Sequence, residues 1–316
     1  MTLTIASQFA EAFNERLRQL PLRPRVIAAP RDQPWNAAAE ADILLVGPTN
    51  AWLTSCRQAS PDGWPGKVRW VFSWSAGVDG YPRWLLDAPF VTCGRGVASS
   101  DIADYVIAAI YQHSKNLEAA RVRSRAQWQF RPVGSVVGST IGILGFGTIG
   151  TQVASRARAL GAAVIAVRRR ALPSNIDGTI LVDDPAAVVA VADHIVVAMP
   201  LTSATHKLVD ARLLAHAKPS AHLINVSRGG IIDQHALIAA LDDGRLGFAT
   251  LDVTDPEPLP EGHPLWTHPK VRLTPHISTA SIARVSSSLF DKFAADLARF
   301  AHGEAPPDLV DPVAGY

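Results

Sequence analysis

Three side chains with complementary chemistry follow three apolar stretches in the second half of the chain. Arg228, Glu257 and His276 each come within four residues of the end of such a stretch. If these stretches form parallel strands of one sheet, their carboxyl ends meet at one edge, where open α/β sheets bind ligands. We therefore expect a guanidinium, a carboxylate and an imidazole to converge at this edge.

These three groups suit the transfer of a hydride to a carbonyl carbon. Reduction of a 2-oxo acid needs a proton at the developing alkoxide, and a charged His276 can supply it near neutral pH. Glu257 would favour that charged form, and Arg228 offers a fixed fork of donors to the substrate carboxylate and carbonyl. Together they would position the substrate and stabilise the oxyanion. Taken singly, each also has a structural interpretation: a satisfied histidine, a solvated loop carboxylate and a strand-capping arginine.

A glycine-rich turn supplies the second chemical feature. The apolar run 140–144 leads into Gly145-x-Gly147-x-x-Gly150, and a helical pattern follows as far as Gly161. This strand–turn–helix context is typical of a dinucleotide-binding turn. Gly145 would permit the tight turn, Gly147 the approach of a pyrophosphate and Gly150 the close packing of the helix, whose N-terminus favours phosphate. The alternative is an ordinary glycine-rich turn of another α/β protein.

The residues after the next expected strand bear on the choice of nicotinamide cofactor. The run 163–167 continues directly into Arg168-Arg169-Arg170. An acidic residue at this place would bind a ribose 2′-hydroxyl, whereas arginine matches a 2′-phosphate. We therefore expect NADPH to be preferred, with NAD as the alternative if these arginines are solvated loop cations.

Composition limits the class of protein and its partners. A chain of 316 residues is longer than one hydrophobic core usually supports, which indicates two domains. A net charge of +2 gives no reason to expect nucleic acid or a membrane as partner. Cys56 and Cys93 form neither a C-x-x-C motif nor a metal-binding spacing, so we expect no disulfide and no metal. Without a leader or an 18-residue apolar run, the protein is expected to be soluble and cytoplasmic.

The first 98 residues are expected to form part of a small α/β domain for the substrate. Helical spacing of apolar residues runs from Phe9 to Leu20, and further short strands should alternate with loops or helices: 3–7, 26–29, 43–46 and 68–73. The loop 75–80 follows the last of these strands. Its small residues leave backbone N–H groups free to hold an anion such as a carboxylate, although it could equally be a plain turn before a helix at 81–86.

Residues 99–280 are expected to form the dinucleotide-binding domain, with a doubly wound parallel sheet. A long helix over about 102–126 would lead into it, with Ser99, Ser100 and Asp101 as capping candidates and an apolar stripe that includes Leu117. Strands should alternate with helices over 140–144, 163–167, 194–199, 222–227, 248–253 and 271–274. An amphipathic helix in residues 281–316 should then return to the first domain, which is thus smaller, discontinuous and flavodoxin-like.

Five motifs together resemble the D-isomer-specific 2-hydroxyacid dehydrogenases over nearly the whole chain. They are Ser-Ala-Gly-Val-Asp at 75–79, Gly-Phe-Gly-Thr-Ile-Gly at 145–150, Asn-Val-Ser-Arg-Gly-Gly at 225–230, Asp-Pro-Glu-Pro at 255–258 and Thr-Pro-His at 274–276. The pattern is most similar to the glyoxylate/hydroxypyruvate reductase branch. Asp104 departs from it, because the family usually carries glutamate there.

The resemblance implies roles for residues in both domains. It implies Arg228, Glu257 and His276 as the catalytic set and a homodimer joined through the nucleotide domains. It further implies that the amides of Ala76, Gly77 and Val78 bind the substrate carboxylate. For the cofactor, it implies that Thr148 and Ile149 lie at the pyrophosphate and that Val226 and Ser227 lie beside the cofactor. Asp252 would contact the nicotinamide carboxamide.

Two other interpretations stay open. A nucleotide-sensing or partner-binding protein on the same scaffold would keep the glycine turn without turnover. A methyltransferase would explain the glycines but not the arginine, glutamate and histidine.

The substrate side chain is also open. Five tryptophans could line a specificity pocket, but such residues are more often found in the core or at an interface. They are Trp52, Trp70, Trp74, Trp128 and Trp266. Trp128 is a candidate for a dimer contact.

Overall fold

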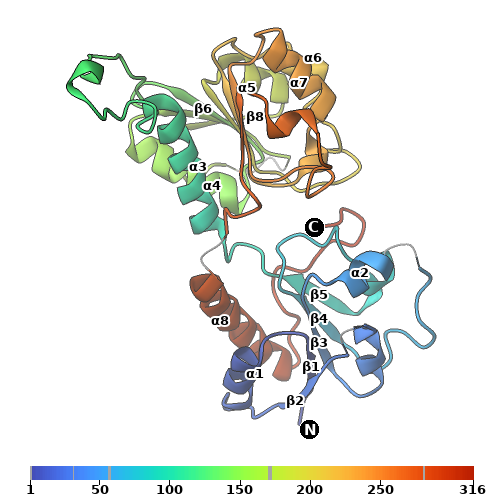
Figure 1. Ribbon diagram of the computed structural model, residues 1–316. Helices are drawn as coiled ribbons and strands as arrows, with labels where there is room; N and C mark the ends of the chain where they lie inside the picture. The colour runs from blue at the N-terminus through green and yellow to red at the C-terminus, as the bar shows by residue number, and fades with distance from the viewer. Residues whose placement is uncertain (1, 31, 56–57, 170–172, 280–281) are drawn as a thin grey trace. The chain divides into compact units, whose positions relative to one another are not determined.

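The computed structural model describes residues 2–30, 32–55, 58–169, 173–279 and 282–316 (Figure 1). The chain divides into two compact units. Unit 1 contains residues 1–98 and 281–316, and unit 2 contains residues 99–280.

Unit 1 is built on a five-stranded parallel sheet with the order β2-β1-β3-β4-β5, which is the flavodoxin-like order. Its central strands β1, β3 and β4 are buried along their whole length, as expected where both faces of a parallel sheet are covered. The strands are β1 (Thr4–Ser7), β2 (Arg25–Ala28), β3 (Ile43–Val46), β4 (Trp70–Ser73) and β5 (Phe90–Cys93).

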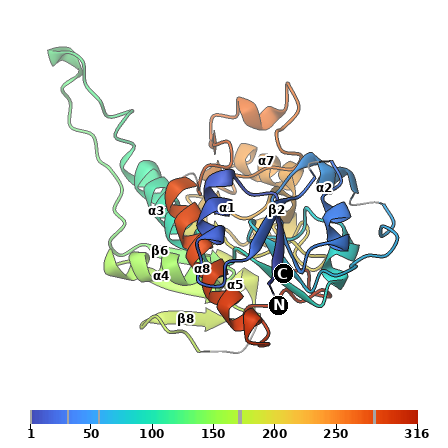
Figure 2. The ribbon, with the colours of Figure 1, turned by 90° about the horizontal axis from the view of Figure 1, so that it is seen from below.

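Helices α1 (Glu11–Arg18) and α8 (Ile282–Ala301) lie side by side and pack on this sheet (Figures 1 and 2). The rings of Trp70 and Phe293 stack with their centroids 5.0 Å apart, and those of Phe13 and Phe290 meet edge to face at 5.3 Å. The returning segment therefore supplies part of the core of unit 1. Three short helical segments complete the unit: α2 (Asn50–Ser55) and 3-10 turns at Pro34–Ala39 and Arg83–Asp87.

Unit 2 contains a seven-stranded parallel sheet with the order β12-β11-β10-β9-β6-β7-β8. The order reverses between β6 and β9, so the sheet is doubly wound and its crevice lies beside the carboxyl end of β6. The strands are β6 (Thr140–Leu144), β7 (Ala163–Val167), β8 (Thr179–Val182), β9 (His194–Val197), β10 (His222–Asn225), β11 (Phe248–Leu251) and β12 (Val271–Leu273).

Aspartates start three of the helices that alternate with these strands. The side chains of Asp184, Asp210 and Asp233 each accept a hydrogen bond from a backbone N–H of the first helical turn that follows. The helices of unit 2 are α3 (Ser99–Lys115), α4 (Thr148–Ala159), α5 (Pro185–Val191), α6 (Ala211–Leu214) and α7 (Gln234–Asp242). No described helix is long and apolar enough to cross a membrane.

The expected helix over 102–126 is wrong beyond Lys115, where α3 ends. Asn116 adopts a left-handed conformation with φ +41°, which breaks the helix, and Leu117 is 71% exposed instead of continuing the buried stripe. Residues 116–138 form an extended arm, and every residue from 116 to 135 is exposed (Figure 2, green). The polar and charged residues of this arm leave no apolar face to hold a helix against the sheet.

Candidate active site

The turn between β6 and α4 has the shape that a dinucleotide needs. Gly145 has φ +110°, and a Cβ there would lie 2.6 Å from the carbonyl oxygen of Ala198. A Cβ at Gly150 would lie 2.3 Å from the carbonyl oxygen of Gly145, so only glycine lets helix and strand approach this closely. A Cβ at Gly147 would meet nothing within 4 Å, which is the open space that a pyrophosphate would occupy.

Residues around this turn could hold the rest of the cofactor. Thr148 and Ile149 form the start of α4, where backbone N–H groups have no intrahelical acceptor. Val226 and Ser227 are buried directly after β10, and the Ser227 N–H donates to the Asn225 side chain at 3.1 Å. These groups could hold a nucleotide, and the cofactor roles of these residues stay a prediction.

Arg168 lies beside the glycine turn. Its guanidinium is 6.0 Å from the ring centroid of Phe146, and its Nη1 donates to the Pro173 carbonyl at 3.3 Å. Arg168 is partly buried and Arg169 is exposed, immediately after β7, while Arg170 lies outside the described residues. At the place where an acidic residue would bind a 2′-hydroxyl, the described chain carries two cations, which fits a 2′-phosphate.

The structure brings His276 and Glu257 into direct contact. Nδ1 of His276 lies 2.7 Å from Oε1 of Glu257, and both side chains are about two-fifths exposed. They follow β12 and β11, and Arg228 follows the next strand of the sheet, β10. Arg228 is partly buried, and its Nη1 donates to the Ser227 carbonyl at 2.8 Å. An acid–base pair and a guanidinium therefore follow three adjacent strands at one edge.

Asp252 holds the turn that carries His276. This carboxylate is 1% exposed; its Oδ1 accepts from the Ile277 N–H at 2.8 Å and its Oδ2 from the Ser278 N–H at 2.9 Å. His276 itself has φ +52°, a left-handed conformation that costs a non-glycine residue on the order of 1–3 kcal/mol. The sequence analysis did not predict this structural role of Asp252. The signal for it is a carboxylate that comes directly after a buried strand.

Hydrogen bonds fix the backbone of the loop 75–80, which follows β4. The Ser75 N–H donates to Ser73 Oγ at 3.1 Å, the Cys93 thiol donates to the Ala76 carbonyl at 3.3 Å, and the Tyr81 N–H donates to the Val78 carbonyl at 3.1 Å. The loop thus starts at the carboxyl end of a strand with a fixed backbone. A carboxylate-binding role for the amides of Ala76, Gly77 and Val78 stays a prediction.

A histidine cluster lies at the opposite edge of the unit 2 sheet, where β9 and β10 begin. We define it as His113, His194 and His222; no such grouping was expected from the sequence, although His194 and His222 are register partners. The rings of His113 and His222 stack at 4.3 Å, Nδ1 of His194 lies 3.4 Å from Nδ1 of His222, and Nε2 of His222 lies 2.8 Å from Thr250 Oγ1. Burial lowers the pKa of all three, that of His194 to about 4.

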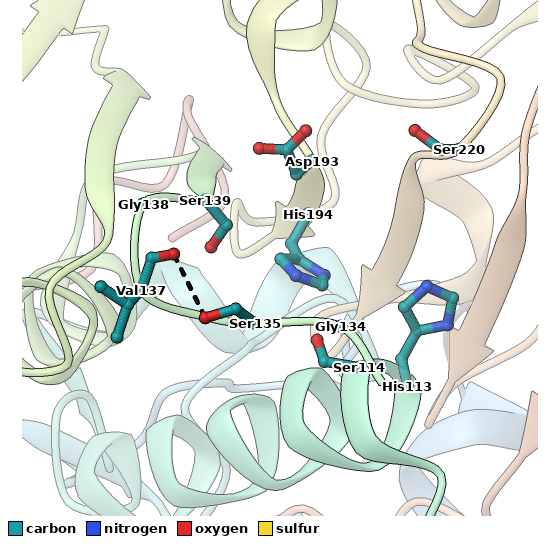
Figure 3. Close-up of a pocket in the computed structure, with 10 residues that line it drawn as sticks. All are labelled: His113, Ser114, Gly134, Ser135, Val137, Gly138, Ser139, Asp193, His194 and Ser220. Carbon is teal, nitrogen blue, oxygen red and sulfur yellow. Dashed lines mark hydrogen bonds between the residues drawn. The ribbon is translucent and has the colours of Figure 1, made fainter. Parts of the chain in front are cut away.

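A pocket of about 500 Å³ opens beside this cluster (Figure 3). The pocket is lined by the end of α3, by the end of the arm that leads into β6, and by the turns before β9 and β10. The lining residues are His113, Ser114, Gly134, Ser135, Val137, Gly138, Ser139, Asp193, His194 and Ser220. Because it lies at the amino ends of the strands, this pocket is separate from the edge that carries His276.

Within the described residues, no group of three or more His, Cys, Asp or Glu side chains is arranged to hold a metal ion. Cys93 is free and buried, and Cys56 lies outside the described residues.

Comparisons with known proteins agree on one family. The family profile "D-isomer specific 2-hydroxyacid dehydrogenase, NAD binding domain" matches residues 107–278. The chain is 31% identical over 264 residues to glyoxylate/hydroxypyruvate reductase A of Serratia proteamaculans, covering 79% of this chain and 82% of that protein.

Two solved structures are similar over the full length of the chain. One is a D-isomer specific 2-hydroxyacid dehydrogenase from Xanthobacter autotrophicus Py2 in complex with NADPH and MES, with 27% identity, 100% of this chain and 99% of that chain covered, and a TM-score of 0.81. The other is an NADPH-dependent glyoxylate/hydroxypyruvate reductase from Sinorhizobium meliloti in complex with NADP and sulfate, with 25% identity, the same coverage and a TM-score of 0.78.

Proposed function

Because the chain belongs to the D-isomer specific 2-hydroxyacid dehydrogenase family, and is therefore an NAD(P)-dependent oxidoreductase, we propose that it reduces a small 2-oxo acid of the glyoxylate or hydroxypyruvate type to the D-2-hydroxy acid. The observation that carries the proposal is the 2.7 Å contact between His276 and Glu257 at the carboxyl edge of the unit 2 sheet. The name of the Serratia proteamaculans relative supports the substrate class.

The residues divide the chemistry by charge. A reduced nicotinamide cofactor, held at the turn between β6 and α4, would supply the hydride for the carbonyl carbon. His276, charged beside Glu257, donates a proton to the carbonyl oxygen, so that the alkoxide never develops fully. Arg228 pairs with the substrate carboxylate and polarises the carbonyl. The alternative, a nucleotide sensor on the same scaffold, has no use for the acid–base pair.

Turnover by the unmodified protein and loss of turnover in His276→Ala test this assignment. Absorbance of NADPH should fall with glyoxylate or hydroxypyruvate, and the variant should lose kcat roughly 100-fold or more, because general acid catalysis contributes about that much. The Kd for NADPH should stay within about threefold, since the imidazole is not needed to hold the nucleotide. His235→Gln is a matched control, because its side chain is 97% exposed.

Near-normal turnover in His276→Ala would remove that residue from its role. Tight NADPH binding without turnover of any 2-oxo acid, bulkier ones included, would favour the nucleotide sensor.

We propose NADPH as the preferred cofactor, on the charge of Arg168 and Arg169 and on the NADPH and NADP bound in the two similar structures. The unmodified protein should show a higher kcat/KM with NADPH than with NADH. Arg168→Ser with Arg169→Ser should lower kcat/KM for NADPH roughly 10- to 100-fold, because two charge-assisted contacts to the 2′-phosphate are lost. The value for NADH should change less than about threefold, since NADH lacks that phosphate. Equal values for both cofactors, or a preference for NADH, would contradict the assignment.

We further propose that the protein is a homodimer joined through unit 2. The arm supports this proposal, because Trp128 is 79% exposed and Phe130 is 94% exposed. Aromatic side chains displayed on an extended segment are typical of protein–protein contact surfaces.

A further inference from the structure

A chain of hydroxyl groups connects helix α3 to the turn that carries His276. The Tyr105 hydroxyl lies 2.6 Å from Thr274 Oγ1, and Thr274 Oγ1 donates to Asp252 Oδ1 at 2.6 Å. An ionised carboxylate only accepts hydrogen bonds, so the single hydroxyl proton of Thr274 is committed to Asp252. Tyr105 must therefore donate to Thr274, which gives the chain one direction, Tyr105 to Thr274 to Asp252.

The same carboxylate holds the backbone on the far side of His276. Asp252 accepts the N–H groups of Ile277 and Ser278, and the N–H of His276 donates to the Asp252 carbonyl at 2.9 Å. A residue with φ +52° keeps that conformation only when its surroundings determine it from several directions. Here Thr274 fixes the residues before His276, and the two N–H groups fix those after it.

Tyr105 is well placed to anchor this network. It lies in the middle of α3, a 17-residue helix packed against α4. Burial raises the pKa of Tyr105, so its hydroxyl keeps the proton that it donates to Thr274. Hydrogen bonds in such a chain polarise one another, so the Tyr105 hydroxyl strengthens the bond from Thr274 to Asp252 and helps to fix the position of that carboxylate.

We propose that Tyr105, acting through Thr274 and Asp252, is a positioning residue for His276. It holds the imidazole in the orientation that meets Glu257 and the reacting oxygen, without touching the substrate itself. This inference rests on the proposed role of His276 as proton donor.

Single-atom changes can test the inference. Tyr105→Phe removes the terminal hydroxyl, Thr274→Val removes the relay hydroxyl at nearly constant shape, and Thr274→Ser keeps it. Tyr111→Phe is the matched control, because Tyr111 lies on the same helix and is 37% exposed. We expect Tyr105→Phe and Thr274→Val to lower kcat roughly three- to tenfold, the size of one lost hydrogen bond, while Thr274→Ser and Tyr111→Phe stay within about twofold of the unmodified protein.

Two readouts separate positioning from general loss of structure. The solvent deuterium isotope effect on kcat should rise in Tyr105→Phe and Thr274→Val, because a misplaced acid makes proton transfer slower relative to the other steps. The Kd for NADPH should change less than about threefold. An unchanged kcat, or a lower kcat with weaker NADPH binding and an unchanged isotope effect, overturns the inference.

Amide hydrogen exchange tests the network whether or not the protein turns over a 2-oxo acid. The N–H groups of Ile277 and Ser278 should exchange roughly three- to tenfold faster in Tyr105→Phe and Thr274→Val than in Tyr111→Phe. Equal exchange in all three variants overturns the inference even if the unmodified protein is an active reductase. Failure of the reductase proposal would instead show as absent turnover with the exchange difference intact.

Discussion

At the scale of single residues, the contact between His276 and Glu257 is both close and accessible. Nδ1 of His276 and Oε1 of Glu257 lie 2.7 Å apart, and about two-fifths of each side chain stays open to solvent. Solvent screening weakens the attraction between opposite charges at such a site, so the main effect of the contact should be to orient the imidazole. A proton donor also needs access to solvent, because it must recover its proton in every turnover.

Replacing the carboxylate of Glu257 should lower turnover. In Glu257→Gln the contact with Nδ1 of His276 loses its charged acceptor, so kcat should fall roughly 10- to 100-fold. The steady-state kcat with NADPH and glyoxylate measures the loss. Glu261→Gln, an exposed glutamate four residues further on, serves as control, and an unchanged kcat in Glu257→Gln would count against the pairing.

The contact between His276 and Glu257 could be predicted, but the backbone that supports it could not. Both residues follow apolar runs, and adjacent parallel strands bring such positions together. The left-handed backbone of His276 and the bonds of Asp252 to Ile277 and Ser278 depend on contacts that no local pattern encodes.

At the scale of elements, the two edges of the unit 2 sheet differ in charge state. The carboxyl edge carries exposed ionisable groups, whereas the amino edge carries the buried histidine cluster. Desolvation holds the rings of the cluster neutral, and the pKa of His222 lies well below its ordinary value. The beginnings of β9 and β10 are therefore joined by uncharged imidazoles that stay paired only while they remain neutral.

Acid should destabilise the fold through this cluster. The unfolded chain binds a proton at His194 below about pH 6.5, whereas the folded protein does so only near pH 4, so the free energy of unfolding should fall between these values and level off below them. The contribution of His194 to this loss is on the order of 3 kcal/mol. Urea unfolding at pH 7 and pH 5 should show a smaller difference in His194→Gln than in the exposed control His235→Gln. Equal differences in both variants would exclude the cluster as the cause.

Most strands could be predicted because they coincide with apolar runs, as β1, β3, β6 and β10 do. By contrast, β5 and β8 were missed: β5 comes directly after Pro89 and includes the polar Thr92, and β8 is an edge strand whose Ile180 is 62% exposed. The helical stripe of α3 was extended too far, because Leu117 has the right spacing but no surface to pack on.

At the scale of the whole molecule, the arm is the part of unit 2 that its own sheet leaves uncovered. Its two exposed aromatic residues, Trp128 and Phe130, lie between Arg125 and Arg131, and Glu118 is its one acidic residue. These exposed aromatic side chains are the basis of the proposed contact with a second copy.

Association through the arm can be tested directly. Trp128→Ser combined with Phe130→Ser should convert a dimer into a monomer in size-exclusion chromatography with light scattering, because two exposed aromatic anchors are removed. The melting temperature of dilute protein should change little. Val313→Ser, an equally exposed apolar residue of unit 1 at 84% exposure, is the control. A monomeric unmodified protein, or a double variant that stays dimeric, would contradict the proposal.

The return of the chain to unit 1 imposes an order on biosynthesis. Strands β6 to β12 all leave the ribosome before α8, so the seven-stranded sheet can close while translation continues. Trp70 and Phe72 are made early but lack their partner Phe293 until all of unit 2 has been synthesised. The first segment of unit 1, residues 1–98, thus leaves an aromatic surface uncovered during synthesis, and it is this segment that chaperones would need to shield.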